Sequence, residues 1–201
     1  DSCLNSAGEL IRMRQCKRLT GFDVKNGILS ANPGITIGEV IEVVKKHGWF
    51  IPVSPGTKFV TLGGAVANDI HGKNHNSAGC FGNHVLQLKV KRTNGEEIVC
   101  SRDKNQDFFA ASIGGLGLTG IITEVSIQLK KSLWQFEVEE VFFRNLDEFY
   151  DIADESDEKY EYTVAWVDSL SSHKNLGRGI YMRANPVKSL DSSIADAPPK
   201  D

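Results

Sequence analysis

A glycine-rich stretch at residues 61–85, TLGGAVANDIHGKNHNSAGCFGNHV, most constrains what this chain can fold into. It holds five glycines and three histidines but few long apolar side chains. Glycine loses more conformational entropy on folding than other residues and contributes no side chain to a core. Because long segments of this kind between well-formed elements are usually functional, the stretch indicates a backbone that passes close to a ligand. A glycine-rich surface loop without a ligand is the alternative.

Helices are predicted on both sides of this stretch. Thr36 and Glu39 have the spacing of a capping box, and apolar residues follow at helical spacing until Gly48, which is placed to end the helix. Residues 107–115, DFFAASIGG, predict a second, shorter helix that ends at glycine. An acidic amphipathic helix is expected over 145–156.

Strands account for most of the remaining pattern. Asn26-Gly27 and Asn94-Gly95 predict two tight hairpins, because Asn-Gly favours the turns that join antiparallel strands. Further strands are expected over 134–143, 160–170 and 177–187. One more strand should bury a single face made of the alternating residues Ile121, Thr123, Val125, Ile127 and Leu129.

The pattern as a whole predicts an α+β chain with a domain boundary near residues 131–134. The first domain would span 1–132 and the second 133–201, with a loosely ordered polar tail at its end. The chain has a net charge of −3 and no block of like charge, which argues against a nucleic-acid partner. No run of 18 apolar residues is present, so no transmembrane segment is expected.

The N-terminus carries no visible signal peptide, and we expect a protein that is cytoplasmic or peripheral to a membrane. Cys3, Cys16, Cys80 and Cys100 lack C-x-x-C spacing, which favours free thiols in a reducing compartment.

Two motifs resemble known sites without matching them. His71 and His75 are four residues apart, but the intervening segment lacks the glutamate of H-E-x-x-H, so we expect no metal. Gly115–Gly120 reads GLGLTG, which matches the Rossmann fingerprint letter for letter. A predicted helix precedes it and a strand follows, the reverse of the Rossmann order, so a Rossmann dinucleotide site is excluded. A close approach to a ligand and a simple tight turn both remain open.

The stretch PGTKFVTLGGAVANDIHGKNHNSAGCFGNHV, followed by GGLGLTGII, resembles the PCMH-type FAD-binding domain of the vanillyl-alcohol-oxidase-type flavoproteins. Within that superfamily it is most similar to the decaprenylphosphoryl-ribose 2'-oxidase-like FAD-linked oxidases. The similarity continues into YTVAWVDSLSSHKNLGRG, which resembles the start of that family's substrate domain. The resemblance implies the second half of an FAD-binding domain, a mixed or antiparallel sheet with flanking helices, plus the start of an α+β substrate domain.

The resemblance also implies a set of cofactor-binding residues. The PGT turn would touch the FAD pyrophosphate through backbone N–H groups, the DIHG segment would run toward the isoalloxazine, and GLGLTG would lie near the adenosine. His71 and Lys73 would face the substrate side of the flavin, although His71 could instead prop the loop. The residues expected to line FAD are Gly56, Thr57, Val60, Gly63, Gly64, Ala67, Asn68, Ile70, His71, Gly72, Leu116, Gly117 and Ile122.

An oxidoreductase activity follows from the same resemblance. The full protein would oxidise a secondary alcohol of a small-molecule or lipid-linked sugar by hydride transfer to flavin, with the electron acceptor left open. FAD would be non-covalent, because the histidine that holds it covalently in some relatives lies in an earlier loop with no counterpart here. We expect an internal fragment whose first phosphate loop lies before Asp1 and whose main catalytic groups lie after Asp201. The alternatives are another sugar or aldonolactone oxidase, or a non-catalytic module that binds flavin or a nucleotide.

Overall fold

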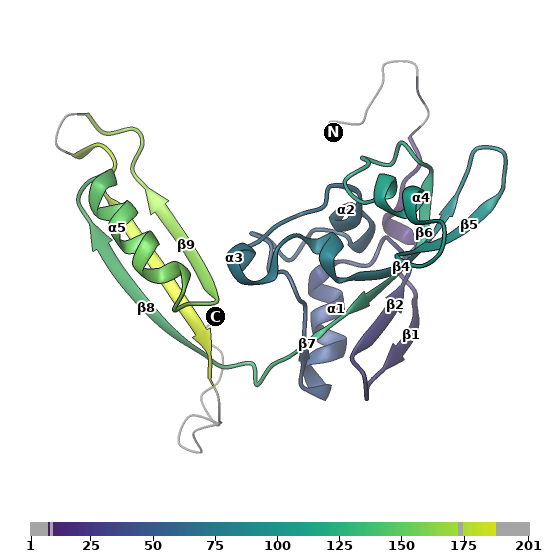
Figure 1. The fold of residues 1–201 in the computed structure, drawn as a ribbon, viewed down its shortest axis with the longest axis horizontal. Helices are drawn as coiled ribbons and strands as arrows, with labels where there is room; N and C mark the ends of the chain where they lie inside the picture. The colour runs from purple at the N-terminus through teal and green to yellow at the C-terminus, as the bar shows by residue number, and fades with distance from the viewer. Residues whose placement is uncertain (1–7, 9, 173–174, 188–201) are drawn as a thin grey trace. The chain divides into compact units, whose positions relative to one another are not determined.

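The computed structural model describes Gly8, residues 10–172 and residues 175–187. Over these residues the chain is an α+β protein that divides into two compact units (Figure 1). The first unit comprises the described residues up to Gly72 together with Ala78–Lys131. The second comprises Lys73–Ser77 and the described residues from Ser132 onward. The predicted polar tail lies outside the described residues.

The first unit is built on a five-stranded antiparallel sheet with the strand order β1-β2-β6-β4-β5. Both Asn-Gly hairpins are confirmed as β1–β2 and β4–β5, with Gly27 and Gly95 at positive φ. The first unit also contains a short two-stranded pair, β3–β7. The strands of this unit are β1 (Leu19–Asp23), β2 (Ile28–Ala31), β3 (Trp49–Phe50), β4 (Val85–Lys91), β5 (Glu97–Ser101), β6 (Ile121–Gln128) and β7 (Lys130–Lys131).

Short helices connect these strands. The predicted helix over 107–115 is confirmed as α4, which ends before the GLGLTG loop. The helical segments are η1 (Met13–Gln15), α1 (Ile37–Val44), η2 (Lys45–His47), α2 (Leu62–Ala67), α3 (His75–Ala78), η3 (Phe81–His84) and α4 (Gln106–Ser112). No helix in the described part of the chain combines the length and the apolar character needed to cross a membrane.

The capping box at the start of α1 is confirmed. The Thr36 hydroxyl accepts a hydrogen bond from the Glu39 N–H at 3.2 Å, and the Glu39 carboxylate accepts one from the Thr36 N–H at 2.9 Å. Gly48 follows η2 in the left-handed region at φ 71°, where glycine has no steric penalty. The local sequence therefore sets both ends of this helical segment.

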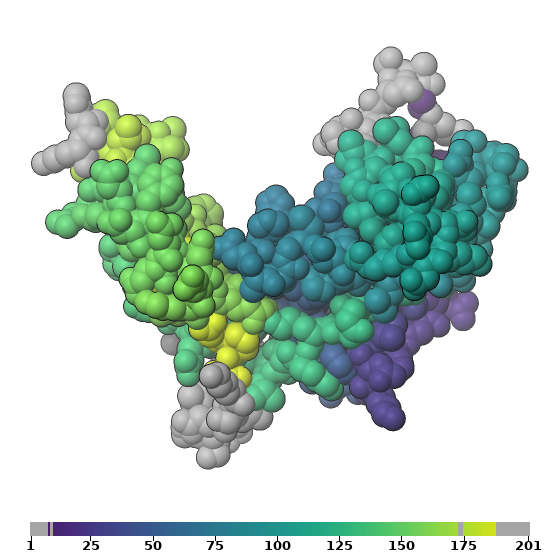
Figure 2. Space-filling model, viewed as in Figure 1, coloured from purple at the N-terminus to yellow at the C-terminus, as the bar shows by residue number. Residues whose placement is uncertain are grey.

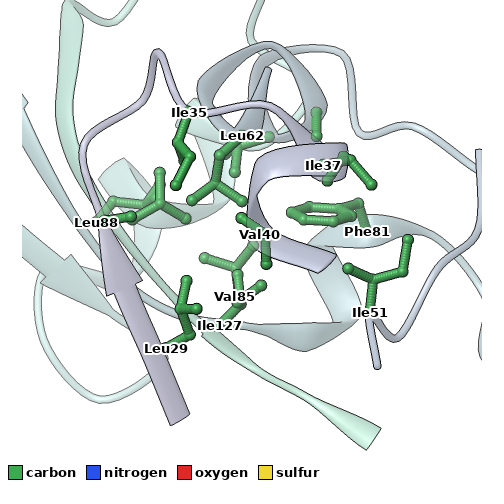
Figure 3. Close-up of a cluster of buried hydrophobic side chains, with 14 of the residues drawn as sticks. Leu29, Ile35, Ile37, Val40, Ile51, Leu62, Phe81, Val85, Leu88 and Ile127 are labelled. Carbon is green, nitrogen blue, oxygen red and sulfur yellow. The ribbon is translucent and has the colours of Figure 1, made fainter. Parts of the chain in front are cut away.

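The apolar face of α1 covers the sheet and forms the core of the first unit. Figure 3 shows Val40 of α1 with the side chains of Leu29, Val85 and Ile127 from the three central strands. Phe81, from the glycine-rich stretch, is fully buried in the same cluster. Part of that stretch is thus core structure rather than surface loop.

The face predicted for β6 is wrong at its start. Ile121 and Thr123 were expected on the buried face, but Ile122 is the buried residue, with 8% of its surface exposed. Lys89 of β4 pairs with Glu124 while its neighbour Val90 pairs with Ile122, so the register shifts across Thr123. A β-bulge adds one residue to a strand and reverses the alternation before it.

The second unit has a three-stranded antiparallel sheet in the order β8-β10-β9 with one helix, α5. The three predicted strands and the acidic helix are confirmed. The bounds are β8 (Phe136–Phe143), α5 (Leu146–Asp157), β9 (Tyr162–Val167) and β10 (Gly179–Pro186). In the view of Figure 2, the green side chains of α5 lie in front of the yellow strand β10.

A polar cluster joins α5 to this sheet. Arg183 of β10 is 8% exposed, and its guanidinium donates to both carboxylate oxygens of Glu139 on β8 and to the Ser156 hydroxyl on α5. The bidentate pair with Arg183, together with a hydrogen bond from Tyr160, holds the pKa of Glu139 below its usual range. Arg183 thus links both α5 and the outer strand β8 to the central strand β10.

We expect the capping box to make the first unit sensitive to acid. The backbone hydrogen bond from Thr36 and the ion pair with Lys17 lower the pKa of Glu39 from 4.5 to about 2. Because the folded pKa is lower than the unfolded one, this stabilisation is present above pH 4.5 and is lost as the pH falls toward 2. Glu39→Gln keeps an acceptor for the cap but removes the charge, so the free energy of unfolding should vary less over this window. Chemical denaturation at a series of pH values measures this free energy of unfolding.

Glu96→Gln, in the exposed β4–β5 turn, is the matched control and should leave the pH profile close to that of the wild type. If the free energy of unfolding of Glu39→Gln depended on pH as in the wild type, Glu39 would not be the source of the acid sensitivity.

Candidate functional site

The PGT turn is held by the start of α1. The N–H groups of Ile37 and Gly38 donate to the carbonyl oxygens of Val60 and Lys58, each at 2.9 Å. The first amides of a helix have no partner within the helix, so this pairing satisfies them with the segment that follows the turn. The turn is thereby fixed to the core from its C-terminal side.

Three successive amides in this turn are free. Within the described part of the chain, the N–H groups of Gly56, Thr57 and Lys58 donate to no acceptor. All three residues are exposed, and a side chain at Gly56 would meet no atom within 4 Å. Consecutive unpaired backbone N–H groups can bind an anion. The turn therefore presents donors, with open space beside them.

The other edge of the turn contacts the DIHG segment. A Cβ at Gly72 would overlap the carbonyl oxygen of Ser54 and crowd the nitrogen of Pro55. Glycine is required there because two backbone segments touch. Ile70 packs partly against the core, while His71 between them is exposed. The structure thus places the backbone of Gly72 against Ser54 and Pro55, at the start of the PGT turn.

The glycine-rich stretch contains a short helix, α2, where a loop was expected. Thr61 caps it by accepting from the Gly64 N–H at 3.2 Å, and the Gly63 N–H donates to the Pro33 carbonyl at 2.8 Å. These two amides are therefore used within the protein. Only Thr61 Oγ1, at 3.0 Å, lies near a Cβ built on Gly64, whereas one on Gly63 would collide with Pro33. Of the glycine pair, Gly64 is the less crowded.

The GLGLTG loop closes the C-terminal end of α2. The N–H of Gly114 donates to the Val66 carbonyl at 2.9 Å, and the N–H of Leu116 donates to the Ala67 carbonyl at 2.8 Å. These bonds satisfy helix-terminal carbonyls and bring Ala67 and Asn68 together with Leu116 and Gly117. Gly117 has φ 78°, and a Cβ added to it would meet no atom within 4 Å, so the loop is a tight turn with an open side.

The remaining predicted residues lie deeper in the fold. Val60 packs partly against the core, and Ile122 is buried within it on β6. Lys73 belongs to the second unit, so it is not grouped with the other predicted residues, which lie in the first unit. Among the described residues, no three His, Cys, Asp or Glu side chains form a group that could hold a metal ion. Cys16, Cys80 and Cys100 are free, and Cys3 lies outside the described residues.

Sequence reasoning missed Asp69. Its carboxylate accepts a hydrogen bond from the Gly82 N–H at 2.7 Å, and its backbone has φ 41°. The residue therefore ties the end of α2 to the start of η3. The only local signal was an aspartate beside an asparagine, residue types that tolerate the left-handed region.

Comparison with known proteins identifies the family of this chain. A protein-family model described as an FAD binding domain matches residues 1–101, half of the chain. The chain belongs to the FAD binding domain family.

Individual relatives of this FAD binding domain include several oxidoreductases. The chain is 35% identical to decaprenylphosphoryl-β-D-ribose oxidase of Mycolicibacterium smegmatis over 94% of its own length and 42% of that protein. It is 28% identical to L-gulonolactone oxidase of Bos taurus, over 77% of the chain and 34% of the relative, and 27% identical to D-lactate dehydrogenase of Anaerostipes hadrus, over 61% and 27%. The chain spans less than half the length of each of these relatives.

The PGT turn fits part of the cofactor that the family name implies. FAD carries an anionic pyrophosphate, and the free amides of Gly56, Thr57 and Lys58 are suitable donors for it. The open position at Gly56 would let a ligand approach the backbone. Lys58 adds an exposed ammonium group, which lies 5.9 Å from the ring centroid of Phe59. The donor set and the charge both suit a phosphate group.

The two glycines that border this turn should respond differently to alanine. Gly72→Ala forces apart the backbone segments that meet at Ser54, so it should destabilise the fold by about 1–3 kcal/mol. Gly56→Ala adds a methyl group in open space and should change the free energy of unfolding by less than about 0.5 kcal/mol. Urea denaturation of both variants measures the difference. Equal losses of stability would contradict the assignment of Gly72 as a packing glycine.

Proposed function

We propose that the full-length protein is an FAD-dependent oxidoreductase that oxidises a secondary alcohol of a small-molecule or lipid-linked sugar. The observation that carries this proposal is the 35% identity to decaprenylphosphoryl-β-D-ribose oxidase over 94% of the chain, which includes part of the second unit. When bound, FAD supplies the hydride acceptor at its N5 atom, and the protein supplies binding and orientation.

In this proposal the free amides of the PGT turn bind the pyrophosphate. Gly64 lines the cofactor, the DIHG segment runs toward the isoalloxazine, and Leu116 and Gly117 lie at the adenosine end. The donors are backbone groups, so binding does not depend on a charged side chain. We propose non-covalent FAD, since none of these contacts involves a bond to the ring.

His71 and Lys73 are the side chains that we assign to the substrate side of the flavin. Oxidation of an alcohol removes a hydroxyl proton as well as a hydride. An imidazole can accept such a proton in its neutral form, and His71 is exposed. Lys73 provides a cation that can hold an oxygen of the substrate. If His71 instead only props the loop, its replacement would lower flavin binding rather than turnover.

A second candidate activity is oxidation of an aldonolactone. The observation in its favour is the similarity to L-gulonolactone oxidase over 77% of the chain. A non-catalytic flavin-binding module is the third candidate, because a fold alone does not determine an activity.

We expect the full-length protein to purify with a yellow cofactor that leaves it on denaturation. Heat or acid should release free FAD into the supernatant, since the proposed contacts are hydrogen bonds and packing. Absorbance of supernatant and pellet, followed by chromatography of the released flavin, measures this. Flavin that stays with the precipitated protein would contradict non-covalent binding, and a colourless protein would favour a module without a redox role.

The substrate classes can be separated by anaerobic reduction of the bound flavin. Decaprenylphosphoryl-β-D-ribose should bleach the absorbance of oxidised flavin, whereas L-gulonolactone and D-lactate should bleach it more slowly by at least about tenfold. Each compound is mixed with the FAD-loaded protein under nitrogen and the absorbance is followed with time. Faster bleaching by L-gulonolactone would replace the first candidate with the second. No bleaching by any of the three would argue against both.

A further inference from the structure

One short segment of the glycine-rich stretch, Lys73–Ser77, belongs to the second unit. The residues before it, up to Gly72, and those after it, from Ala78, belong to the first unit. The segment includes Lys73, the cation that the proposed function assigns to the substrate. What holds this segment therefore matters for the position of that cation.

Hydrogen bonds from two elements of the second unit hold the segment. The Thr163 N–H donates to the Lys73 carbonyl oxygen at 2.7 Å. Thr163 lies on β9, an edge strand of the three-stranded sheet, where backbone groups on the outer side need partners from outside the sheet. The second bond joins the Asn76 side-chain amide to the Asp157 carboxylate at 2.6 Å, on the last residue of α5. The anchors thus come from two different elements.

The segment also closes on itself. Both the N–H and the hydroxyl of Ser77 donate to the Asn74 carbonyl, at 3.2 Å and 3.1 Å. Asn74 is buried, with 1% of its surface exposed. A turn closed in this way transmits a restraint at Asn76 to the neighbouring Lys73 more directly than an open loop would.

We propose that Thr163 and Asp157 are positioning residues that set the location of Lys73 for the oxidation of the substrate. This inference rests on the proposed function, in which Lys73 contacts the substrate. Lysine has a long flexible side chain, so its reach is defined only if its backbone is held. Thr163 holds that backbone directly, and Asp157 holds the turn that follows it. Neither residue was expected from the sequence to affect the site.

The Asp157–Asn76 pair is the better target for mutation. A hydrogen bond to an ionised carboxylate is stronger than one between neutral groups. Both side chains are exposed, so water can solvate the partner that remains after one is removed, and folding should not be at risk. Thr163 contributes a backbone group, which a side-chain substitution would leave in place.

The experiment compares four single variants and the double variant Asp157→Ala/Asn76→Ala, each in the full-length, FAD-loaded protein. Asp157→Ala and Asn76→Ala each remove the bond, and Asp157→Asn keeps an oxygen that can accept it. Asp154→Ala removes an exposed carboxylate one turn earlier on the same helix and is the matched control. Each variant is measured for amide hydrogen exchange in the segment 73–78 and at Thr163, for flavin content, and for flavin reduction by decaprenylphosphoryl-β-D-ribose.

Asp157→Ala and Asn76→Ala should raise exchange in the segment and at Thr163 by roughly three- to tenfold, the range expected for one lost hydrogen bond. Flavin reduction should slow by a similar factor at unchanged flavin content, and the double variant should be no worse than either single one. Asp157→Asn should keep most of the wild-type protection from exchange and most of the wild-type reduction rate. Asp154→Ala should match the wild type in both. The restoration by Asp157→Asn separates positioning from general destabilisation.

Unchanged exchange in Asp157→Ala would overturn the inference whether or not the flavin is reduced. Raised exchange with an unchanged reduction rate would also overturn it, because the anchor would then be structural only. If the wild-type flavin is not reduced at all, the proposed function fails, and the assignment of Asp157 as a positioning residue for that reaction fails with it. The exchange measurement would still report the anchor itself, so the two failures are distinguishable.

Discussion

The backbone pairing between the start of α1 and residues 58–60 is the constraint on which the rest of the first unit depends. Helix-terminal amides are costly to bury without partners, and here Ile37 and Gly38 find them in the carbonyls of Val60 and Lys58. This pairing fixes the PGT turn relative to the core. The amides at residues 56–58 have no acceptor among the residues that the structure describes, while the chain around them is held.

How much of the fold could be predicted follows from how local each signal is. The capping box at Thr36 and the two Asn-Gly turns involve residues a few positions apart, and all were predicted correctly. The face of β6 was wrong before Thr123 because the bulge there is set by pairing with β4, more than thirty residues away in the sequence. Alternation in one strand carries no information about a partner's register.

The candidate site shows the same difference between local signals and long-range contacts. Its segments are predicted from the sequence by resemblance, but the partner of each backbone amide could not be predicted. The Gly63 N–H is taken by Pro33, and the Gly82 N–H is taken by Asp69. Both bonds span distances in the sequence at which no pattern operates. The assignment of Lys73 to the second unit likewise depends on contacts with β9 and α5, which come about eighty to ninety residues later.

These contacts change what a glycine-rich sequence can be taken to mean. Gly63 and Gly72 are required because a side chain would strike Pro33 or Ser54 within the same protein. Gly56 and Gly117 have no atom of the described chain within 4 Å of an added Cβ. Only the second kind leaves space for something outside the chain, since the first is already explained by packing. The density of glycines indicated a backbone that passes close to a ligand. The space beside each glycine distinguishes a glycine required by packing from one that a ligand can approach.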